Sequence, residues 1–119
     1  MAWNLNSDRP IFIQIVERIE MDIISGKYKP GDKLPSVRDF AAEAAVNPNT
    51  MQKAFTELER TGLVFSQRTT GRFITEDTSM IDELKSTLAI TELLSFMQQL
   101  GFQENEILAM IGQTMKGEK

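Results

Sequence analysis

The polar side chains of residues 47–53 are the first group in the sequence whose types and spacing could do chemistry. The set comprises two asparagines, a threonine, a glutamine and a lysine: Asn47, Asn49, Thr50, Gln52 and Lys53. An amide side chain can form paired hydrogen bonds with adenine, and a threonine hydroxyl can bond a base edge or a phosphate. Lysine is a common phosphate contact. The stretch therefore predicts contact with duplex nucleic acid, with a solvated helix face as the alternative.

Arginines flank this stretch on both sides. Arg38 precedes it, and Arg68 and Arg72 follow it around Gly71. An arginine can bond a phosphate or a guanine, and arginines on a hairpin suit the minor groove or the flanking backbone. The alternative is a surface ion pair for Arg38 and ordinary exposed charges for the two later arginines.

The residues around the polar stretch predict two short helices in a helix-turn-helix. Ser36 has the spacing of a capping box and opens a helix that ends near Ala44. Asn47 can cap the next helix, with Pro48 as its first residue and Gly62 at its end. The free backbone amides at both helix starts are further phosphate donors. Simple capping is the alternative role for Ser36 and Asn47.

A longer helix precedes this pair, and a hairpin follows it. The run Asp8-Arg9-Pro10 predicts a helix start with an acidic cap, and Gly26 predicts its end. Residues 63–67 and 72–75 are typical of strands joined by a short polar link that contains glycine. A two-stranded hairpin is marginal alone, so we expect it to pack on the helices. The fold class is thus mostly α with a small β-hairpin: a winged helix-turn-helix over residues 1–76, whose second helix enters the major groove.

Residues 77–119 predict a separate two-helix segment. A capping box at Ser79 opens a long helix that ends at Gly101, and a last helix follows from Glu104 to Met115. Two helices of this size cannot close a core alone, so we expect a second copy of the chain to cover their apolar faces. The residues expected at this homodimer interface are Leu84, Leu88, Leu94, Met97, Ile107 and Ile111.

An effector pocket is the alternative for part of this segment. Phe96, Met97 and Phe102 are the side chains that could line it. We prefer interface packing, because so short a segment leaves little room for a ligand pocket of ordinary size.

The composition argues against catalysis and cofactors. The chain has no cysteine and no histidine, which removes the common zinc ligands and the usual general base near neutral pH. We find no pairing of nucleophile and base and no glycine-rich phosphate loop. There is also no secretory signal and no apolar run long enough for a bilayer. We expect a cytoplasmic protein that is not an enzyme, needs no cofactor and has no membrane partner.

The net charge of −4 does not argue against DNA, because it is unevenly distributed. Residues 1–76 hold equal numbers of acidic and basic side chains, so the whole excess of negative charge lies in residues 77–119. Within residues 33–72, six basic side chains face four acidic ones. A local basic surface is what attracts phosphates.

The sequence resembles the GntR family of bacterial regulators, particularly its YtrA-like subgroup. The resemblance covers about residues 8–76. It is carried by Pro10-Ile11-Phe12, Gln14-Ile15, Gly26, Pro30-Gly31, Lys33-Leu34-Pro35-Ser36-Val37-Arg38, Val46-Asn47-Pro48-Asn49-Thr50, Ala54-Phe55, Leu58-Glu59, Gly62-Leu63, Gly71 and Phe73-Ile74.

The resemblance implies a winged helix, dimers on palindromic operators and repression relieved by a signal, which would be an unidentified small-molecule effector. It implies DNA contact at Arg38, Asn47, Asn49, Thr50 and Gly71. Wings of this family often carry Arg-Gly-Lys-Gly-Thr before the final Phe, whereas this chain has Arg68-Thr69-Thr70-Gly71-Arg72. The wing lysine and one glycine are therefore missing, and Arg72 restores the charge.

The sequence is compatible with two alternative functions. The first is a sequence-specific DNA-binding regulator, a repressor that binds an inverted-repeat operator as a homodimer. The alternative is a protein-interaction module on the same fold, since a fold does not fix a function. The polar residues 47–53 and the wing arginines favour DNA.

Overall fold

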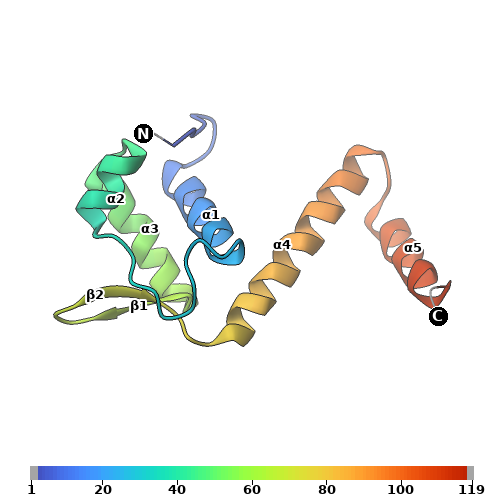
Figure 1. The fold of residues 1–119 in the computed structure, drawn as a ribbon. Helices are drawn as coiled ribbons and strands as arrows, with labels where there is room; N and C mark the ends of the chain where they lie inside the picture. Colours follow the sequence, from blue (N-terminus) through green and yellow to red (C-terminus); the bar gives the residue numbers. More distant parts are fainter. Residues whose placement is uncertain (1–2, 118–119) are drawn as a thin grey trace. The chain divides into compact units, whose positions relative to one another are not determined.

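The computed structural model describes residues 3–117 and contains five helices and one hairpin in that range. In chain order the elements are α1 (Ile11–Ile24), α2 (Val37–Ala44), α3 (Pro48–Thr61), β1 (Val64–Gln67), β2 (Gly71–Ile74), α4 (Thr78–Gln99) and α5 (Glu104–Gly117) (Figure 1). This order is the predicted winged helix-turn-helix followed by two helices. The chain divides into an N-terminal unit, Met1–Asp82, and a C-terminal unit, Glu83–Lys119.

The core of the N-terminal unit lies where α3 packs on α1 and α2. Ile15 and Ile19 of α1, Phe40 of α2 and Phe55 and Leu58 of α3 are fully buried there. The rings of Phe40 and Phe55 meet edge to face, with their centroids 5.9 Å apart, an arrangement that adds to the stabilisation from burial. Because α3 uses one side for this core, its opposite side is left for other contacts.

The two helices of the helix-turn-helix start at the predicted caps. Ser36 Oγ accepts a hydrogen bond from the Asp39 backbone N–H at 3.0 Å, and Asn47 Oδ1 accepts one from the Asn49 N–H at 2.7 Å. Ala45 ends α2 in the left-handed conformation, with φ of 60°. The left-handed residue that ends α2 and leads to α3 is therefore an alanine rather than a glycine.

The start of α1 differs from the prediction. We expected Asp8 as an acidic cap, but the helix begins at Ile11, and Pro10 occupies the cap position with no side-chain hydrogen bond. The preceding chain is held instead by the buried Gln14 side chain. Its amide donates to the backbone oxygens of Asn6 and Arg9 and accepts from the Asn6 N–H.

The N-terminal arm, which comprises residues 3–10 before α1, packs on the end of α2 through Trp3. Trp3 is buried, and its ring meets Phe40 edge to face with a centroid separation of 5.2 Å. The Trp3 indole N–H donates to Glu43, and the Arg18 guanidinium lies 4.7 Å from the ring centroid. The arm is thus part of the helix-turn-helix core.

Strand β2 of the wing has backbone hydrogen bonds on both of its sides. β1 and β2 pair antiparallel, joined by residues 68–70. On the other side of β2, the segment that leads from α1 to α2 forms an isolated β-bridge: Leu34 N–H donates to Arg72 O, and Ile74 N–H donates to Asp32 O, each at 2.8 Å. We expected the wing to pack on the helices, and this backbone pairing supplies stability that two strands alone would lack.

α4 starts at Thr78, two residues earlier than a cap at Ser79 allows. The prediction of Ser79 as the cap is wrong: the Asp77 carboxylate accepts hydrogen bonds from the Ser79 backbone N–H, at 3.0 Å, and from the Ser79 hydroxyl. The hydrogen bond from the Ser79 side chain, more than those from the backbone N–H groups of Ser79 and Met80, lowers the pKa of Asp77.

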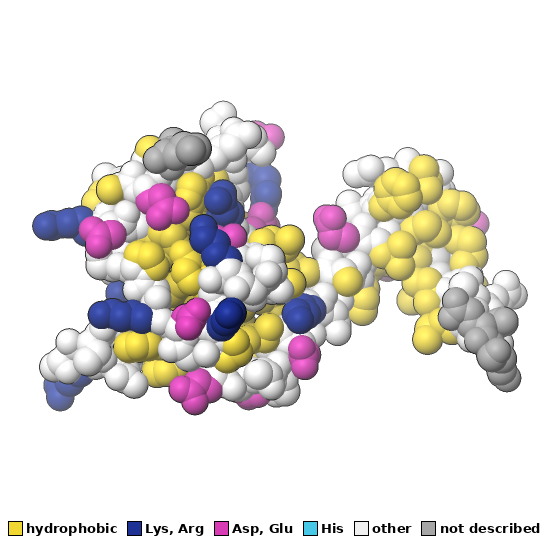
Figure 2. Space-filling model, in the orientation of Figure 1, with side chains coloured by type: hydrophobic (Ala, Val, Ile, Leu, Met, Phe, Trp, Pro, Cys, Tyr) yellow, Lys and Arg dark blue, Asp and Glu magenta, His cyan; other side chains and the backbone are white. Residues whose placement is uncertain are grey.

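The C-terminal unit carries apolar side chains on its surface. Of the residues predicted for a dimer interface, Leu84, Leu88, Leu94, Met97 and Ile111 are half-buried, and Ile107 is fully buried. The most exposed apolar side chains are others, among them Phe96, which is 58% exposed, and Leu108, which is 67% exposed. Figure 2 shows yellow, hydrophobic side chains gathered over the surface of the unit that contains α5.

Candidate nucleic-acid interface

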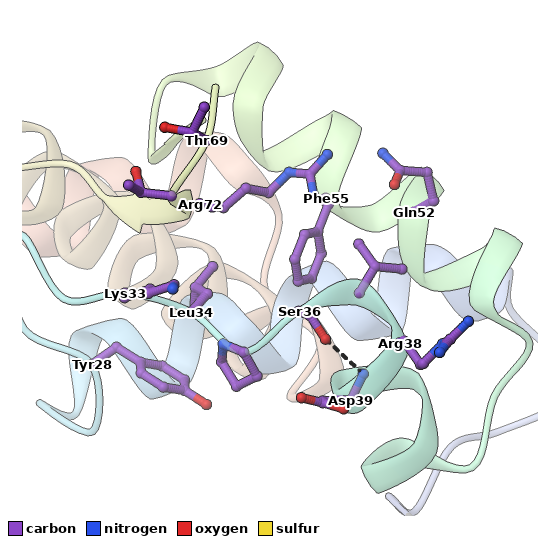
Figure 3. A pocket seen from close by; sticks show the side chains of 14 residues that line it. Tyr28, Lys33, Leu34, Ser36, Arg38, Asp39, Gln52, Phe55, Thr69 and Arg72 are labelled. Atoms are coloured by element: carbon purple, nitrogen blue, oxygen red, sulfur yellow. Dashed lines mark hydrogen bonds between the residues drawn. The ribbon is translucent and has the colours of Figure 1, made fainter. Parts of the chain in front are cut away.

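A groove in the N-terminal unit brings together the start of α2, the exposed side of α3 and the wing. Its volume is about 970 Å³. Five of the predicted site residues line it, namely Ser36, Arg38, Gln52, Gly71 and Arg72 (Figure 3). The other five, which are Asn47, Asn49, Thr50, Lys53 and Arg68, lie outside its lining. The groove therefore joins three elements that are separate in the sequence.

The start of α2 carries an exposed arginine, Arg38. Arg38 is exposed and forms no ion pair with any residue in the range that the structure describes. It follows Ser36, whose hydroxyl caps the helix while the first backbone amides of α2 remain without helical partners. A helix start with a free arginine beside it is suited to an anion such as a phosphate.

The first turns of α3 expose the predicted polar face. Asn47, Asn49, Gln52 and Lys53 are exposed and Thr50 is half-buried. These side chains are not all free. Asn47 uses its oxygen as the cap, Gln52 Nε2 donates to Thr56 Oγ1 at 3.3 Å, and Lys53 Nζ lies 4.3 Å from the centroid of the half-buried Phe12 ring.

The wing approaches the segment 31–34 closely at Gly71. This residue has φ of +115°, a conformation that favours glycine, and a Cβ added there would lie 3.0 Å from Lys33 Cε. Arg68 stands exposed at the tip of the wing, where Thr70 Oγ1 donates to Gln67 Oε1 at 2.9 Å. The tip therefore carries a cation on an internally bonded turn.

Lys33 and Tyr28 are groove residues that the site prediction missed. Lys33 is exposed and lines the groove beside the wing, where its bridge to Phe73 of β2 places it. Burial, followed by the nearby carboxylates of Glu43 and Asp22, raises the pKa of Tyr28, so its phenol is neutral and can donate a hydrogen bond into the groove. No local pattern marks Tyr28. Lys33 belongs to the run of residues 33–38 that carries the family resemblance and to the basic excess of residues 33–72, but neither assigned it a contact.

Arg72 is held more firmly than an exposed hairpin charge. Its Nε donates to Glu59 Oε2 of α3 at 2.8 Å. Its guanidinium carbon lies 5.2 Å from the centroid of the Phe55 ring. The side chain thus ties the wing to α3.

Comparison with known proteins identifies the family to which the chain belongs. Residues 13–74 match the family model described as bacterial regulatory proteins, gntR family. The chain belongs to the GntR family. The matched range contains the helix-turn-helix and the wing, and so holds the whole groove. The GntR regulators are DNA-binding transcription regulators rather than enzymes, as we predicted.

Relatives of this GntR protein match over most of its length. It is 40% identical over 111 residues to the uncharacterized HTH-type transcriptional regulator YhcF of Bacillus subtilis, covering 91% of this chain and 92% of the relative. It is 39% identical over 94 residues to the HTH-type transcriptional repressor YtrA of Bacillus subtilis, covering 79% of this chain and 68% of YtrA. The predicted similarity to YtrA is therefore confirmed.

Solved structures agree with this assignment. A GntR family transcriptional regulator from Listeria monocytogenes aligns with a TM-score of 0.75 at 39% identity, covering 92% of this chain and 98% of that one. The structure of AraR(DBD) in complex with operator ORX1 aligns with a TM-score of 0.55 at 27% identity, covering 63% of this chain and 93% of that one.

Two further findings concern other partners. Between residues 3 and 117, no helix is both long enough and apolar enough to cross a bilayer. In the same range, acidic side chains do not gather into a group that could hold a metal ion.

Proposed function

We propose that this GntR protein is a repressor that binds an inverted-repeat operator as a homodimer. The observation that carries the proposal is the groove, where the exposed Arg38, the exposed Lys33 and the wing lie beside the polar face of α3. The relative YtrA is a repressor, and AraR(DBD) was solved with an operator. Because its partner is chromosomal DNA, the proposal places the protein in the cytoplasm.

Each part of the site has a role in this proposal. The start of α3, with Asn47, Asn49 and Thr50, enters the major groove and reads base edges. Arg38 and the amides at the start of α2 bind backbone phosphates, together with Lys53. Arg68 and Gly71 bring the wing against the minor groove or its flanking phosphates.

The homodimer is supported by a stripe of exposed apolar residues on α4. Ile90, Leu93 and Phe96 recur at intervals of three residues, so they lie on one side of the helix, and Leu100 follows directly after its end. Each of the four is more than 40% exposed. An exposed apolar stripe of this kind marks an interaction surface. A two-fold dimer through this surface would present two copies of α3 to an inverted repeat.

The implied effector belongs to the same proposal. A small molecule that binds the C-terminal helices and changes the spacing of the two DNA-binding units would lower operator affinity.

Selection from a random-sequence duplex pool, followed by mobility shift, tests DNA binding. We expect enrichment of an inverted repeat whose half-sites lie about one helical turn, or a multiple of it, apart. Affinity should fall steeply as salt rises, because phosphate contacts release counterions. Failure to enrich any sequence over the starting pool would contradict the proposal.

Sedimentation equilibrium tests the dimer. The unaltered chain should be dimeric at tens of micromolar, whereas Phe96→Asp should shift it to monomer. Thr91→Asp, at an exposed polar position of α4, is the matched control and should remain dimeric. A monomeric unaltered chain, or a dimer that Phe96→Asp leaves intact, would remove this part of the proposal.

A further inference from the structure

The contact between Arg72 and Glu59 is part-buried and joins two elements of the interface. The Arg72 side chain is 25% exposed and that of Glu59 is 27% exposed, and Arg72 Nε donates to Glu59 Oε2 at 2.8 Å. Figure 3 shows the Arg72 side chain reaching from β2 toward α3, with its guanidinium beside Phe55. The ring of Phe55, with its centroid 5.2 Å from the guanidinium carbon, limits how the group can move.

Glu59 holds Arg72 from outside the groove. Arg72 is among the residues that line the groove, whereas Glu59 is not. A guanidinium has five N–H donors in a planar fork, and the bond to Glu59 uses the Nε donor. Between residues 3 and 117, no group accepts a hydrogen bond from the two Nη atoms, so their four donors can serve a ligand in the groove.

The local sequence of α3 explains why Glu59 can reach this position. Gln52, Phe55 and Glu59 are spaced by three and four residues, so they lie along one side of the helix. Gln52 and Phe55 line the groove. Glu59 follows on the same side, next to the base of the wing.

We propose that Glu59 is a positioning residue for DNA binding, which fixes the Arg72 guanidinium so that its Nη atoms meet a backbone phosphate. This inference rests on the proposed function. A free arginine loses much rotamer freedom when it binds, and a guanidinium that is already oriented loses less. Glu59 thus strengthens the binding of a polyanion although it is itself an anion.

The sign of the effect makes the proposal testable. Removing a carboxylate beside a phosphate site strengthens DNA binding if only charge matters, because repulsion is relieved. If Glu59 orients Arg72, its removal weakens binding instead. The two accounts predict opposite changes in the dissociation constant.

The experiment measures operator affinity by fluorescence anisotropy on the full chain, with the duplex enriched by the selection above. We expect Glu59→Ala to bind roughly fivefold more weakly, because an Arg72 side chain that is no longer held must lose its rotamer freedom on binding. Glu57→Ala is the matched control, since Glu57 is on the same helix, does not line the groove and bonds Arg60. This control should bind as well as the unaltered chain, or more tightly.

A double-mutant cycle separates positioning from a general loss of structure. In the Arg72→Ala background, Glu59→Ala should cause no further loss of affinity, because the group it orients is absent. Glu59→Gln keeps an acceptor for Nε and should restore part of the affinity lost in Glu59→Ala. Tighter binding by Glu59→Ala than by Glu57→Ala, or a loss that persists without Arg72, would overturn the proposal. If Glu59→Ala fails to fold, the cycle is run with Glu59→Gln, which should show a smaller loss that also disappears without Arg72.

A second measurement does not require an operator. The Arg72 Nε–H signal in a ¹⁵N-correlated NMR spectrum should be shifted away from the free arginines in the unaltered chain and in Glu57→Ala, and should join them in Glu59→Ala. An unshifted signal in the unaltered chain would contradict the proposed orientation. A shifted signal without enrichment of any duplex would instead show that the proposed function has failed while the positioning contact exists.

Discussion

Replacing Asn47 by aspartate separates the two roles that this residue can have at the start of α3. Asn47 Oδ1 caps the helix by accepting from the Asn49 N–H at 2.7 Å. A carboxylate oxygen can occupy the same place, because aspartate caps helices as well as asparagine does. The change therefore keeps the cap but replaces an amide that could donate to a base by a negative charge.

The expected stability follows from the cap. Asn47 is exposed, so no burial is lost, and a carboxylate at a helix start gains about 0.5 kcal/mol from the helix dipole. For a unit of this size, this raises the melting temperature by about 3 °C. Asn47→Ala removes the bond and should cost about 1 kcal/mol, which lowers the melting temperature by about 5 °C.

The expected binding follows from the charge. At an effective dielectric constant of about 40, a carboxylate about 6 Å from a phosphate is repelled by about 1.4 kcal/mol, which corresponds to a tenfold loss of affinity. The lost amide donor adds to this if Asn47 bonds a base. We therefore expect Asn47→Asp to be at least as stable as the unaltered chain and to bind the operator at least about tenfold more weakly.

Calorimetry and fluorescence anisotropy on the same preparation measure the two quantities. Operator binding by Asn47→Asp that equals that of the unaltered chain would refute the reasoning and leave Asn47 as a helix cap. Melting of Asn47→Asp at the low temperature expected for Asn47→Ala would show that the hydrogen bond described here is not the one that stabilises α3.

Three further predictions test other parts of the structure. Gly71→Ala should lower the free energy of unfolding in urea by about 2 kcal/mol, because φ is +115° and the new Cβ would meet Lys33 Cε. Gly26→Ala is the control, at φ of +90° in open space, and should lower the free energy of unfolding by less. Equal decreases for the two variants would show that the contact with Lys33 has no effect. Arg38→Ala and Lys33→Ala should each weaken operator binding and each reduce the slope of log affinity against log salt by about one, whereas an unchanged slope would show that neither side chain binds a phosphate. Because the pKa of Asp77 is lowered, its charge stabilises the folded state at pH values above its ordinary pKa of 3.8, and this stabilisation disappears as the pH falls through the lowered pKa. The melting temperature of the unaltered chain should therefore exceed that of Asp77→Asn at pH 7, by a difference that vanishes in acid. A difference in melting temperature that does not change with pH would contradict this prediction.

The elements of the DNA-binding unit could be predicted because their signals are local. Ser36 and Asn47 cap helices through bonds to residues two or three positions away, and such bonds follow from residue type and spacing. The polar face of α3 follows in the same way, because Met51 and Phe55 take the buried side of the helix.

The unpredicted parts of the interface depend on contacts between distant residues. Lys33 reaches the groove only because the segment 31–34 pairs with β2, and no strand pattern marks that segment. Arg72 meets Glu59 across the junction of the wing and α3, so the sequence shows two charges without showing that they pair. The incorrect cap at Ser79 had another cause: Asp77, two residues earlier, can also cap a helix, and α4 begins early enough for Asp77 to take the role.

The packing of Trp3 gives the protein an intrinsic optical probe at the helix-turn-helix. It is the only tryptophan in the chain, and its ring is enclosed by Phe40, the Arg18 guanidinium and the end of α2. Release of the N-terminal arm would expose the indole to water and move its emission to longer wavelength while the helices stay folded. Fluorescence can therefore follow, without any label, whether the arm stays docked when a duplex binds a few residues away.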